Sequence, residues 1–279
     1  MDNKSLFNNQ YKLGILGLGK MGGSILSGII KSNIYRKSDV LLFDVNETVI
    51  NNYTNDGFTF ALCEKELIEK SEIILIAIKP QMFYRLKELD LDKELDNKYS
   101  VKTIVSIAAG KTIDDLKEIF GCQKYIRVMP NTPALISCGA TAIARDKDVD
   151  DETFNNIKNI FESIGVALEI SEDKMNEIIP VNGSMPAYLY YFAEGFIEDA
   201  VKNGIDYEVA KKLACEAIIG SAKMILETNK PINELIKDVC SPGGATLEGM
   251  KALDEGKFKE TIYKTSKACI DKAYELSRK

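Results

Sequence analysis

Short apolar runs alternate with segments in which apolar residues recur every three or four positions through the first 170 residues. The runs are typical of buried strands, and the longer period is typical of helices with one buried face. The expected strands are 12–16, 40–44, 58–62, 73–78, 103–107, 125–129, 141–145 and 166–170. The expected helices are 20–31, 47–56, 64–70, 113–120 and 150–164. This alternation predicts a mostly parallel, doubly wound sheet.

The pattern changes after about Ser171, beyond which only helices are expected. They span 175–203, with a kink at Gly183 and Pro186, and then 207–227, 232–239, 246–254 and 259–279. Segments 188–192 and 214–224 are apolar over most of their circumference, which is typical of buried helices. One small helical domain offers too little core to bury them. We therefore expect a second copy of the chain to cover them, with a core inside one chain as the alternative.

Composition and charge exclude several classes of partner. A net charge of −6 argues against nucleic acid or an anionic membrane as a ligand. The first ten residues are polar, and no apolar run is long enough to span a bilayer, so we expect a cytoplasmic protein without membrane contact. The six cysteines lie far apart and form no C-x-x-C pair, which predicts reduced thiols, many of them buried, rather than disulfides or a metal site.

The chain contains no histidine. This absence excludes dehydrogenases that use a histidine acid or base, Ser-His-Asp and Cys-His hydrolases, and histidine-ligated metals. No metal is expected.

Three glycines follow the first expected strand in G-x-G-x-x-G spacing, at Gly17, Gly19 and Gly22. Strand, glycine turn and helix in this order are the context of a dinucleotide-binding turn. Gly17 allows the tight turn, Gly19 lets a pyrophosphate approach the backbone, and Gly22 lets the helix pack against the strand. The free N–H groups of the helix then face the diphosphate. An ordinary glycine-rich turn is the alternative.

Asp44 ends the second expected strand. A carboxylate at this position accepts hydrogen bonds from the adenosine ribose and repels a 2′-phosphate. Because Lys and Arg are absent from 45–56, we expect NADH to be favoured over NADPH. A solvated Asp in a turn is the alternative.

Three more segments follow expected strands, at the sheet edge where open α/β sheets bind ligands. They are 78–80, 106–110 and 129–133. Lys79 borders the cofactor in one interpretation and is an ordinary surface lysine in the other. The small residues of the second segment suit a flat ring, and Asn131 offers an amide within a loop fixed by two prolines.

A further candidate site is the segment from Ser241 to Thr246, just before a helix. The N–H groups of Ala245 and Thr246 start that helix without an internal partner and suit a carboxylate. The hydroxyls of Ser241 and Thr246 lie beside them. The alternative is a plain helix N-cap.

Five motifs together resemble the pyrroline-5-carboxylate reductase family, from about Lys12 to the C-terminus. The motifs are Ile15–Gly22, Ala77–Pro80, Arg127–Ala134, Gly183–Tyr188 and Ser241–Thr246. The resemblance implies a Rossmann domain over 1–170 and an all-helical domain over 171–279, of the type found at the C-terminus of 6-phosphogluconate dehydrogenase, that binds substrate and forms a homodimer. Family dimers commonly assemble into decamers. The implied reaction is hydride transfer from NAD(P)H to L-1-pyrroline-5-carboxylate, which yields L-proline in the last step of proline biosynthesis.

The resemblance also places the site residues. The expected cofactor-binding residues are Leu16, Gly17, Leu18, Gly19, Lys20, Met21, Gly22, Asp44, Ala77, Ile78, Lys79, Pro80, Ile107, Ala108, Ala109 and Asn131. The expected substrate-binding residues are Ser241, Gly243, Gly244, Ala245 and Thr246. Thr246 is the one expected catalytic residue, with its hydroxyl at the ring nitrogen. A protonated cyclic imine is already a strong electrophile, so its reduction needs orientation more than a strong acid, and the absence of histidine is consistent with this chemistry.

The chain departs from the family pattern at three positions. Asn182 and Met185 stand in a segment that usually runs Ser-Gly-Ser-Gly-Pro-Ala-Tyr, and Glu64 stands where many members have Asn. There are two alternative functions. A reductase-like nucleotide-binding protein with a regulatory role would fit these changes. A β-hydroxyacid dehydrogenase would need a lysine on the helix that opens the second domain, and residues 175–201 contain none.

Overall fold

The structure, a computed structural model, describes residues 10–89, 102–121 and 123–277. It contains two compact units. The first runs to Ser184 and includes the chain from Ile270 onward, and the second runs from Met185 to Cys269. The sequence-based division into 1–170 and 171–279 differs from this one in two places, because residues 171–184 and the chain from Ile270 onward belong to the first unit. Among the described residues, no helix is both long and apolar enough to cross a lipid bilayer.

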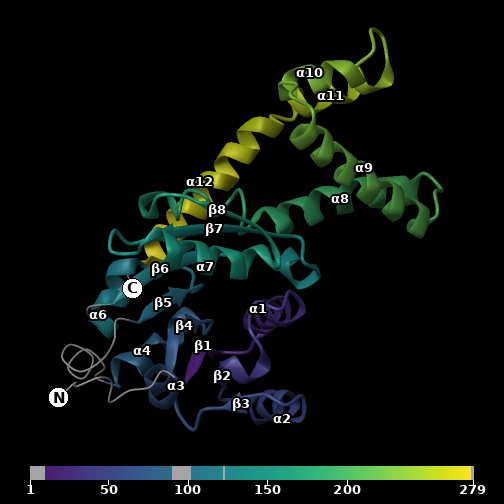
Figure 1. Cartoon of the computed structure of the whole chain (residues 1–279). Helices are drawn as coiled ribbons and strands as arrows, with labels where there is room; N and C mark the ends of the chain where they lie inside the picture. Colours follow the sequence, from purple (N-terminus) through teal and green to yellow (C-terminus); the bar gives the residue numbers. More distant parts are fainter. Residues whose placement is uncertain (1–9, 90–101, 122, 278–279) are drawn as a thin grey trace, which may run out of the picture. The chain divides into compact units, whose positions relative to one another are not determined.

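One eight-stranded sheet forms the centre of the first unit, in the order β3-β2-β1-β4-β5-β6-β7-β8 (Figure 1). The strands are β1 (Tyr11–Leu16), β2 (Val40–Phe43), β3 (Thr59–Phe60), β4 (Ser71–Ile76), β5 (Thr103–Ser106), β6 (Lys124–Met129), β7 (Gly139–Arg145) and β8 (Gly165–Glu169). Neighbours are parallel except β6 and β7, which are antiparallel. The order reverses between β1 and β4, so the predicted doubly wound sheet is confirmed.

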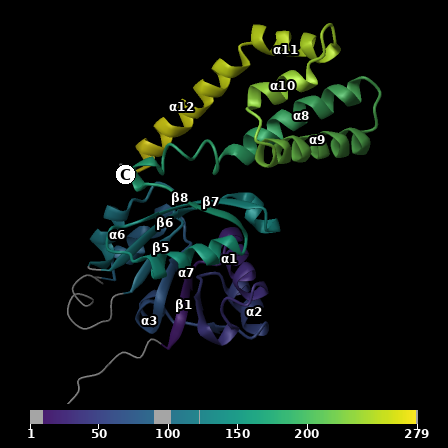
Figure 2. The same ribbon diagram turned by 45° about the horizontal axis from the view of Figure 1, so that its top comes forward.

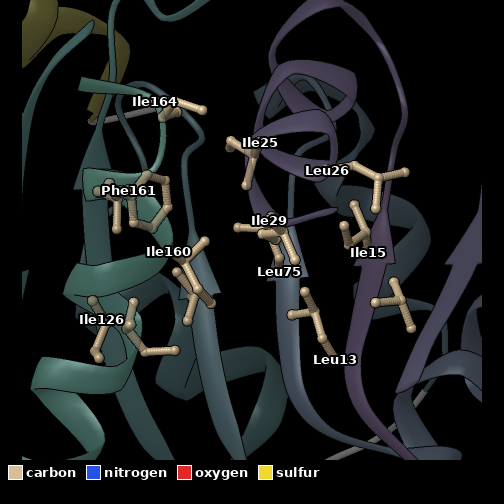
Figure 3. Packing of buried hydrophobic residues seen from close by; sticks show 14 of the residues in the cluster. Leu13, Ile15, Ile25, Leu26, Ile29, Leu75, Ile126, Ile160, Phe161 and Ile164 are labelled. Carbon is tan, nitrogen blue, oxygen red and sulfur yellow. The ribbon is translucent and has the colours of Figure 1, made fainter. Parts of the chain in front are cut away.

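Helices cover both faces of this sheet. They are α1 (Lys20–Lys31), α2 (Glu47–Asn55), α3 (Glu64–Lys70), α4 (Phe83–Lys87), α6 (Ile113–Phe120) and α7 (Asp151–Glu162). Figure 3 shows the core on one face, where Ile25 and Ile29 of α1 pack over strands β1 and β4, and Phe161 of α7 lies farther along the sheet, on the side of Ile126 of β6. The second core contains the apolar sides of α3, α4 and α6. Helix α4 was not predicted from the sequence pattern.

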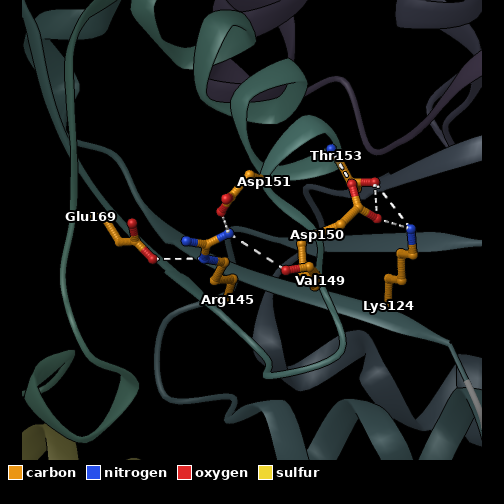
Figure 4. Close-up of polar contacts among 7 residues, drawn as sticks. All are labelled: Lys124, Arg145, Val149, Asp150, Asp151, Thr153 and Glu169. Atoms are coloured by element: carbon orange, nitrogen blue, oxygen red, sulfur yellow. Dashed lines mark hydrogen bonds and ion pairs between the residues drawn. The ribbon is translucent and has the colours of Figure 1, made fainter.

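Polar contacts fasten α7 to the strands beside it (Figure 4). Arg145 on β7 pairs with Glu169 on β8 at 2.8 Å and with Asp151 on α7 at 2.6 Å. Asp150 caps α7 by accepting from the backbone N–H of Thr153 and also pairs with Lys124 on β6. The exposed ion pairs add little stability, whereas the Asp150 cap fixes where the helix begins.

The predicted helix over 175–203 is wrong in its first part. Residues 175–184 form successive turns, and helix α8 (Met185–Lys202) begins only after them. Pro180 has no N–H for a helical hydrogen bond, whereas Pro186 sits in the first turn of α8, where no donor is needed. The other predicted helices and strands are all present.

A buried arginine holds the turns against the sheet. Arg127 on β6 is 2 % exposed, lies 3.5 Å from Glu172 and donates to Asn176 at 3.1 Å. Burial lowers the pKa of Arg127, and the Glu172 carboxylate opposes that shift. Glu172 also accepts from the backbone N–H of Ile113, so one carboxylate joins β6, α6 and the turns.

The second unit is entirely helical over its described residues. It contains α8, α9 (Tyr207–Glu227), α10 (Ile232–Val239), α11 (Ala245–Glu255) and most of α12 (Phe258–Ser277). Helices α8 and α9 lie side by side (Figure 2). They bury very little in the single chain, because Tyr191 is 79 % and Leu213 is 65 % exposed. Packing within the helical unit therefore leaves these side chains uncovered.

The cysteines differ from the prediction. Cys63, Cys138 and Cys215 are exposed, and Cys240 and Cys269 are half-buried. The expectation that many are buried is wrong for the five that the structure describes. Three of these five belong to the helical unit, whose apolar surface is open in the single chain.

Replacing Tyr191 and Leu213 together by Asp should abolish self-association. In a dimer these side chains would lie in an apolar interface, where an unpaired charge is costly. Sedimentation equilibrium at micromolar concentration should give a dimer or larger assembly for the wild type and a monomer for the double variant. The matched control replaces Leu62 and Tyr84, exposed apolar residues of the first unit, by Asp and should keep the wild-type mass. A monomeric wild type would contradict the prediction.

Candidate active site

The turn between β1 and α1 needs its glycines for contact with neighbouring backbone. Gly17 has φ +98° and donates to the carbonyl of Phe43 at 2.9 Å. A Cβ atom on Gly17 would lie 2.8 Å from the carbonyl oxygen of Ala77, and one on Gly22 would lie 2.1 Å from the carbonyl oxygen of Gly17. Both glycines therefore permit a backbone approach that any side chain would prevent.

Gly19 differs, because the space around it is open. A Cβ atom on Gly19 would meet nothing within 4 Å. Gly19 is exposed and is the N-cap of α1, which has no side-chain cap and no acidic residue in its first turn. The first N–H groups of α1 have no partner inside the helix. The turn therefore fits a diphosphate, with open space at Gly19 and unpaired donors behind it.

Asp44 lies beside this turn and is held by backbone donors. One carboxylate oxygen accepts from the N–H of Leu18 at 2.7 Å, and the other accepts from the N–H of Asn46 at 2.9 Å. Each oxygen keeps a second acceptor site, so the carboxylate is oriented and can still accept from ribose hydroxyls. The hydrogen bond to the glycine turn is a second role of Asp44 that the sequence did not indicate.

Strands β4 and β5, which follow β1 in the sheet order, end at the same level as β1. Leu16 pairs with Ile76 and Ile76 pairs with Ser106 in the parallel register. Backbone hydrogen bonds extend this ladder by one residue, from Ala77 to Leu16 at 2.8 Å and from Ile107 to Ile76 at 3.1 Å. The predicted cofactor segments 77–80 and 107–109 thus follow strands that end at the same sheet edge as the glycine turn.

The two interpretations of Lys79 stay open. Its side chain is exposed, and its backbone precedes the short turn Pro80–Met82. Either a ligand or solvent could contact the ammonium group.

Asn131, in the loop after β6, is 8 % exposed and uses its amide within the protein. Its side-chain oxygen accepts from the N–H of Ala140 at 2.9 Å, and its side-chain nitrogen donates to the carbonyl of Asn182 at 3.1 Å. A direct cofactor contact by Asn131 stays a prediction. The sequence marked Asn182 only as a departure from a family pattern, and its contacts are visible only in the fold.

The segment from Ser241 to Gly244 forms a tight turn in the second unit. The N–H of Gly244 donates to the carbonyl of Ser241 at 2.9 Å, and Gly243 has φ +71°. Proline in the second position and glycine in the third are what a type II turn requires. Helix α11 begins immediately afterwards at Ala245, and its N-cap, Gly244, has no side-chain cap. The N–H groups of Ala245 and Thr246 are therefore available to an anion.

The candidate residues thus form two groups, one in each unit. The sheet edge of the first unit carries the predicted cofactor residues, and the α10–α11 turn of the second unit carries the predicted substrate residues. Across the described ranges, no group of three or more His, Cys, Asp or Glu residues could hold a metal ion.

Two family models match the chain. Residues 172–276 match the model described as pyrroline-5-carboxylate reductase dimerisation. Residues 12–110 match the model described as NADP oxidoreductase, coenzyme F420-dependent. The first match covers the helical unit and the turns before it, and the second covers the glycine turn and the strands beside it.

Individual relatives match over nearly the whole chain. The pyrroline-5-carboxylate reductase of Escherichia coli is 35 % identical over 270 residues, which cover 96 % of this chain and 98 % of the relative. The crystal structure of the Plasmodium falciparum pyrroline carboxylate reductase with NADP bound has a TM-score of 0.84 at 30 % identity and covers 96 % of this chain and 99 % of the relative. The reductase structure from Coxiella burnetii gives a TM-score of 0.86 at 27 % identity, with 96 % and 99 % of the two chains covered.

The variants Gly19→Ala and Gly22→Ala should separate an effect on cofactor binding from an effect on stability. Gly19→Ala meets no protein atom, so we expect the free energy of unfolding to change by less than about 1 kcal/mol while the dissociation constant of NADH rises at least about tenfold. Gly22→Ala should instead lower stability, because its methyl group would overlap the Gly17 carbonyl. Urea unfolding and calorimetric titration measure the two effects. Unchanged NADH binding in a folded Gly19→Ala variant would contradict a pyrophosphate at this turn.

Proposed function

The chain belongs to the pyrroline-5-carboxylate reductase family, and we propose that it reduces L-1-pyrroline-5-carboxylate to L-proline with NAD(P)H, the last step of proline biosynthesis. The observation that carries this proposal is the match to reductases of this family over nearly the whole chain. The same chain has two turns, the glycine turn and Ser241–Thr246, each leading into a helix whose first N–H groups have no side-chain cap. The first turn suits a dinucleotide, and the second suits a small carboxylate.

The first unit binds and orients the cofactor. Backbone N–H groups at the start of α1 bind the pyrophosphate, and Asp44 accepts from the adenosine ribose. Segments 77–80 and 107–109 line the remainder of the cofactor. When bound, NAD(P)H supplies the hydride that reduces the C=N bond.

The second unit binds and orients the substrate. The N–H groups of Ala245 and Thr246 hold the carboxylate, and the turn keeps them in place because Gly243 adopts a positive φ. The Thr246 hydroxyl contacts the ring nitrogen, where it accepts from a protonated imine or donates to a neutral one. Addition of a hydride to the C=N carbon of the protonated imine gives the neutral amine, so Thr246 acts mainly as an orienting group.

We infer a preference for NADH. Asp44 stands where a 2′-phosphate would lie, and residues 45–56 provide no Lys or Arg to neutralise one. Glu64, at the start of α3, pairs with Arg85 at 2.6 Å, which reduces the charge that Arg85 can offer to a phosphate.

We also infer that the functional form is a homodimer built through the helical unit, with further assembly into decamers, in the cytoplasm. The exposed apolar surface of α8 and α9 and the match to a dimerisation family support self-association. Nucleic acid and membranes are not among the proposed partners.

Initial rates with L-1-pyrroline-5-carboxylate test the proposed function. The purified protein should oxidise both NADH and NADPH in the presence of this substrate, faster with NADH. The amount of proline formed should equal the amount of cofactor oxidised. A chain that binds NADH yet gives no rate with either cofactor would contradict the proposal and favour a regulatory nucleotide-binding protein.

Thr246→Val should lower kcat/KM by about 10- to 100-fold, because it removes one positioned hydrogen bond worth about 1.5–3 kcal/mol. The variant keeps the shape of the side chain. Thr246→Ser keeps the hydroxyl and serves as the matched control, for which we expect a loss below about fivefold. Steady-state kinetics measure both. Equal activities of wild type and Thr246→Val would remove Thr246 from the mechanism.

Asp44→Ser should shift the ratio of kcat/KM for NADPH to that for NADH upward by about tenfold, since it removes the charge that repels a 2′-phosphate. Glu47→Gln removes a nearby exposed charge at the start of α2 and is the control, for which the ratio should stay constant. If both variants shift the ratio equally, the effect is general electrostatics and Asp44 does not contact the ribose.

A further inference from the structure

Two buried asparagines complete the sheet at the place where β6 ends. The last antiparallel pair of β6 and β7 is Met129 with Ala142. Ala140 lies beyond that pair, where β6 no longer supplies partners. Its N–H donates to the side-chain oxygen of Asn131 at 2.9 Å, and its carbonyl accepts from the side-chain nitrogen of Asn182 at 3.4 Å. Side-chain amides thus replace the missing strand.

Asn182 is engaged through every polar atom of its side chain. Its side-chain nitrogen also donates to the carbonyl of Met129 at 2.7 Å, and its side-chain oxygen accepts from the N–H of Gly183 at 2.6 Å. Its backbone carbonyl accepts from Asn131 at 3.1 Å, and Asn182 is only 7 % exposed. A serine, the residue in the usual family pattern, has one hydroxyl donor and cannot bridge two carbonyl groups.

These contacts hold the loop 130–133 from both sides. Met129 precedes the loop and is fixed by Asn182, while Asn131 within the loop is fixed by Ala140 and Asn182. Pro130 and Pro133 restrict φ in the remaining backbone. The loop is therefore rigid because of groups that lie in the turns preceding α8.

The position of the loop connects it with one half of the cofactor. The pyrophosphate is expected at the start of α1, and the adenosine ribose at Asp44, beyond β2. The sheet order continues on the other side of β1 through β4, β5 and β6. The nicotinamide half must extend in that direction, toward the ends of these strands. The loop after β6 lies at this end of the expected cofactor path.

We propose that Asn182 is a positioning residue for the reaction, which fixes the loop 130–133 where the nicotinamide half binds, through Met129 and Asn131. The inference rests on the proposed function, because it needs a dinucleotide in the site. Asn182 acts through its three side-chain hydrogen bonds and not through contact with the substrate.

Asn182→Asp tests the inference with little change in shape. The variant places a second carboxylate oxygen against the carbonyl groups of Met129 and Ala140, so the loop should lose its anchor. The measurement is calorimetric titration with NADH and with ADP-ribose, which lacks the nicotinamide. We expect the dissociation constant of NADH to rise about tenfold and that of ADP-ribose to change less than about twofold. The kcat should fall while KM for L-1-pyrroline-5-carboxylate stays near the wild-type value.

Asn176→Asp is the matched control. Asn176 is equally buried, lies six positions earlier in the same turns, and accepts from Arg127 through its oxygen, which an aspartate keeps. This variant should bind both ligands like the wild type. Asn182→Ser retains one donor and should show an intermediate loss for NADH, and it replaces Asn182→Asp in the comparison should that variant fail to fold.

Equal losses for NADH and ADP-ribose, or no loss for either, would overturn the inference while leaving the proposed function intact. A wild-type chain that does not bind NADH would overturn the proposed function and the inference with it.

Discussion

The close packing of the start of α1 against the turn that follows β1 is the constraint on which the rest of the site depends. Gly22 lies so close to Gly17 that a methyl group would sit 2.1 Å from the Gly17 carbonyl oxygen. This contact brings the start of α1 to the end of β1, between the ends of β2 and β4. Asp44 then reaches the Leu18 N–H from the β2 side. The turn, the helix start and the carboxylate are therefore one assembly, held by backbone hydrogen bonds and ready for a dinucleotide.

The sequence predicted best where local chemistry decides the structure. Helix α6 is an example, since Thr112 and Asp115 cap each other in a capping box and the helix runs over the predicted residues. The glycine turn is another, because its spacing and its place between strand and helix specify a ligand and a conformation together. In both cases the residues that determine the feature lie within a few positions of one another.

Prediction failed where distant residues decide. Helical periodicity after residue 175 was correct for α8, but Pro180 interrupts the helix before it, and the resulting turns are held by Arg127 and Asn131 on other elements, which bond to Asn176 and Asn182. The role of Asn131 inside the protein follows from the end of the β6–β7 ladder, which no single segment reveals. The exposure of Cys215 belongs to the open apolar surface of the helical unit, whereas Cys63 and Cys138 are exposed in the first unit. The family resemblance identified candidate residues in both units, whereas the support around them required the fold.

In the proposed mechanism, the sheet edge of the first unit holds the cofactor, and the helical unit presents a carboxylate site and buries its apolar surface against another copy. The chemical step is direct hydride transfer to the imine carbon. The most direct test supplies L-1-pyrroline-5-carboxylate and NADH that carries deuterium on both positions of nicotinamide C4, and locates the label in the product by mass spectrometry and NMR. Direct transfer gives proline with one deuterium on ring carbon 5. Proline without deuterium, or no proline from a chain that binds NADH, would contradict it.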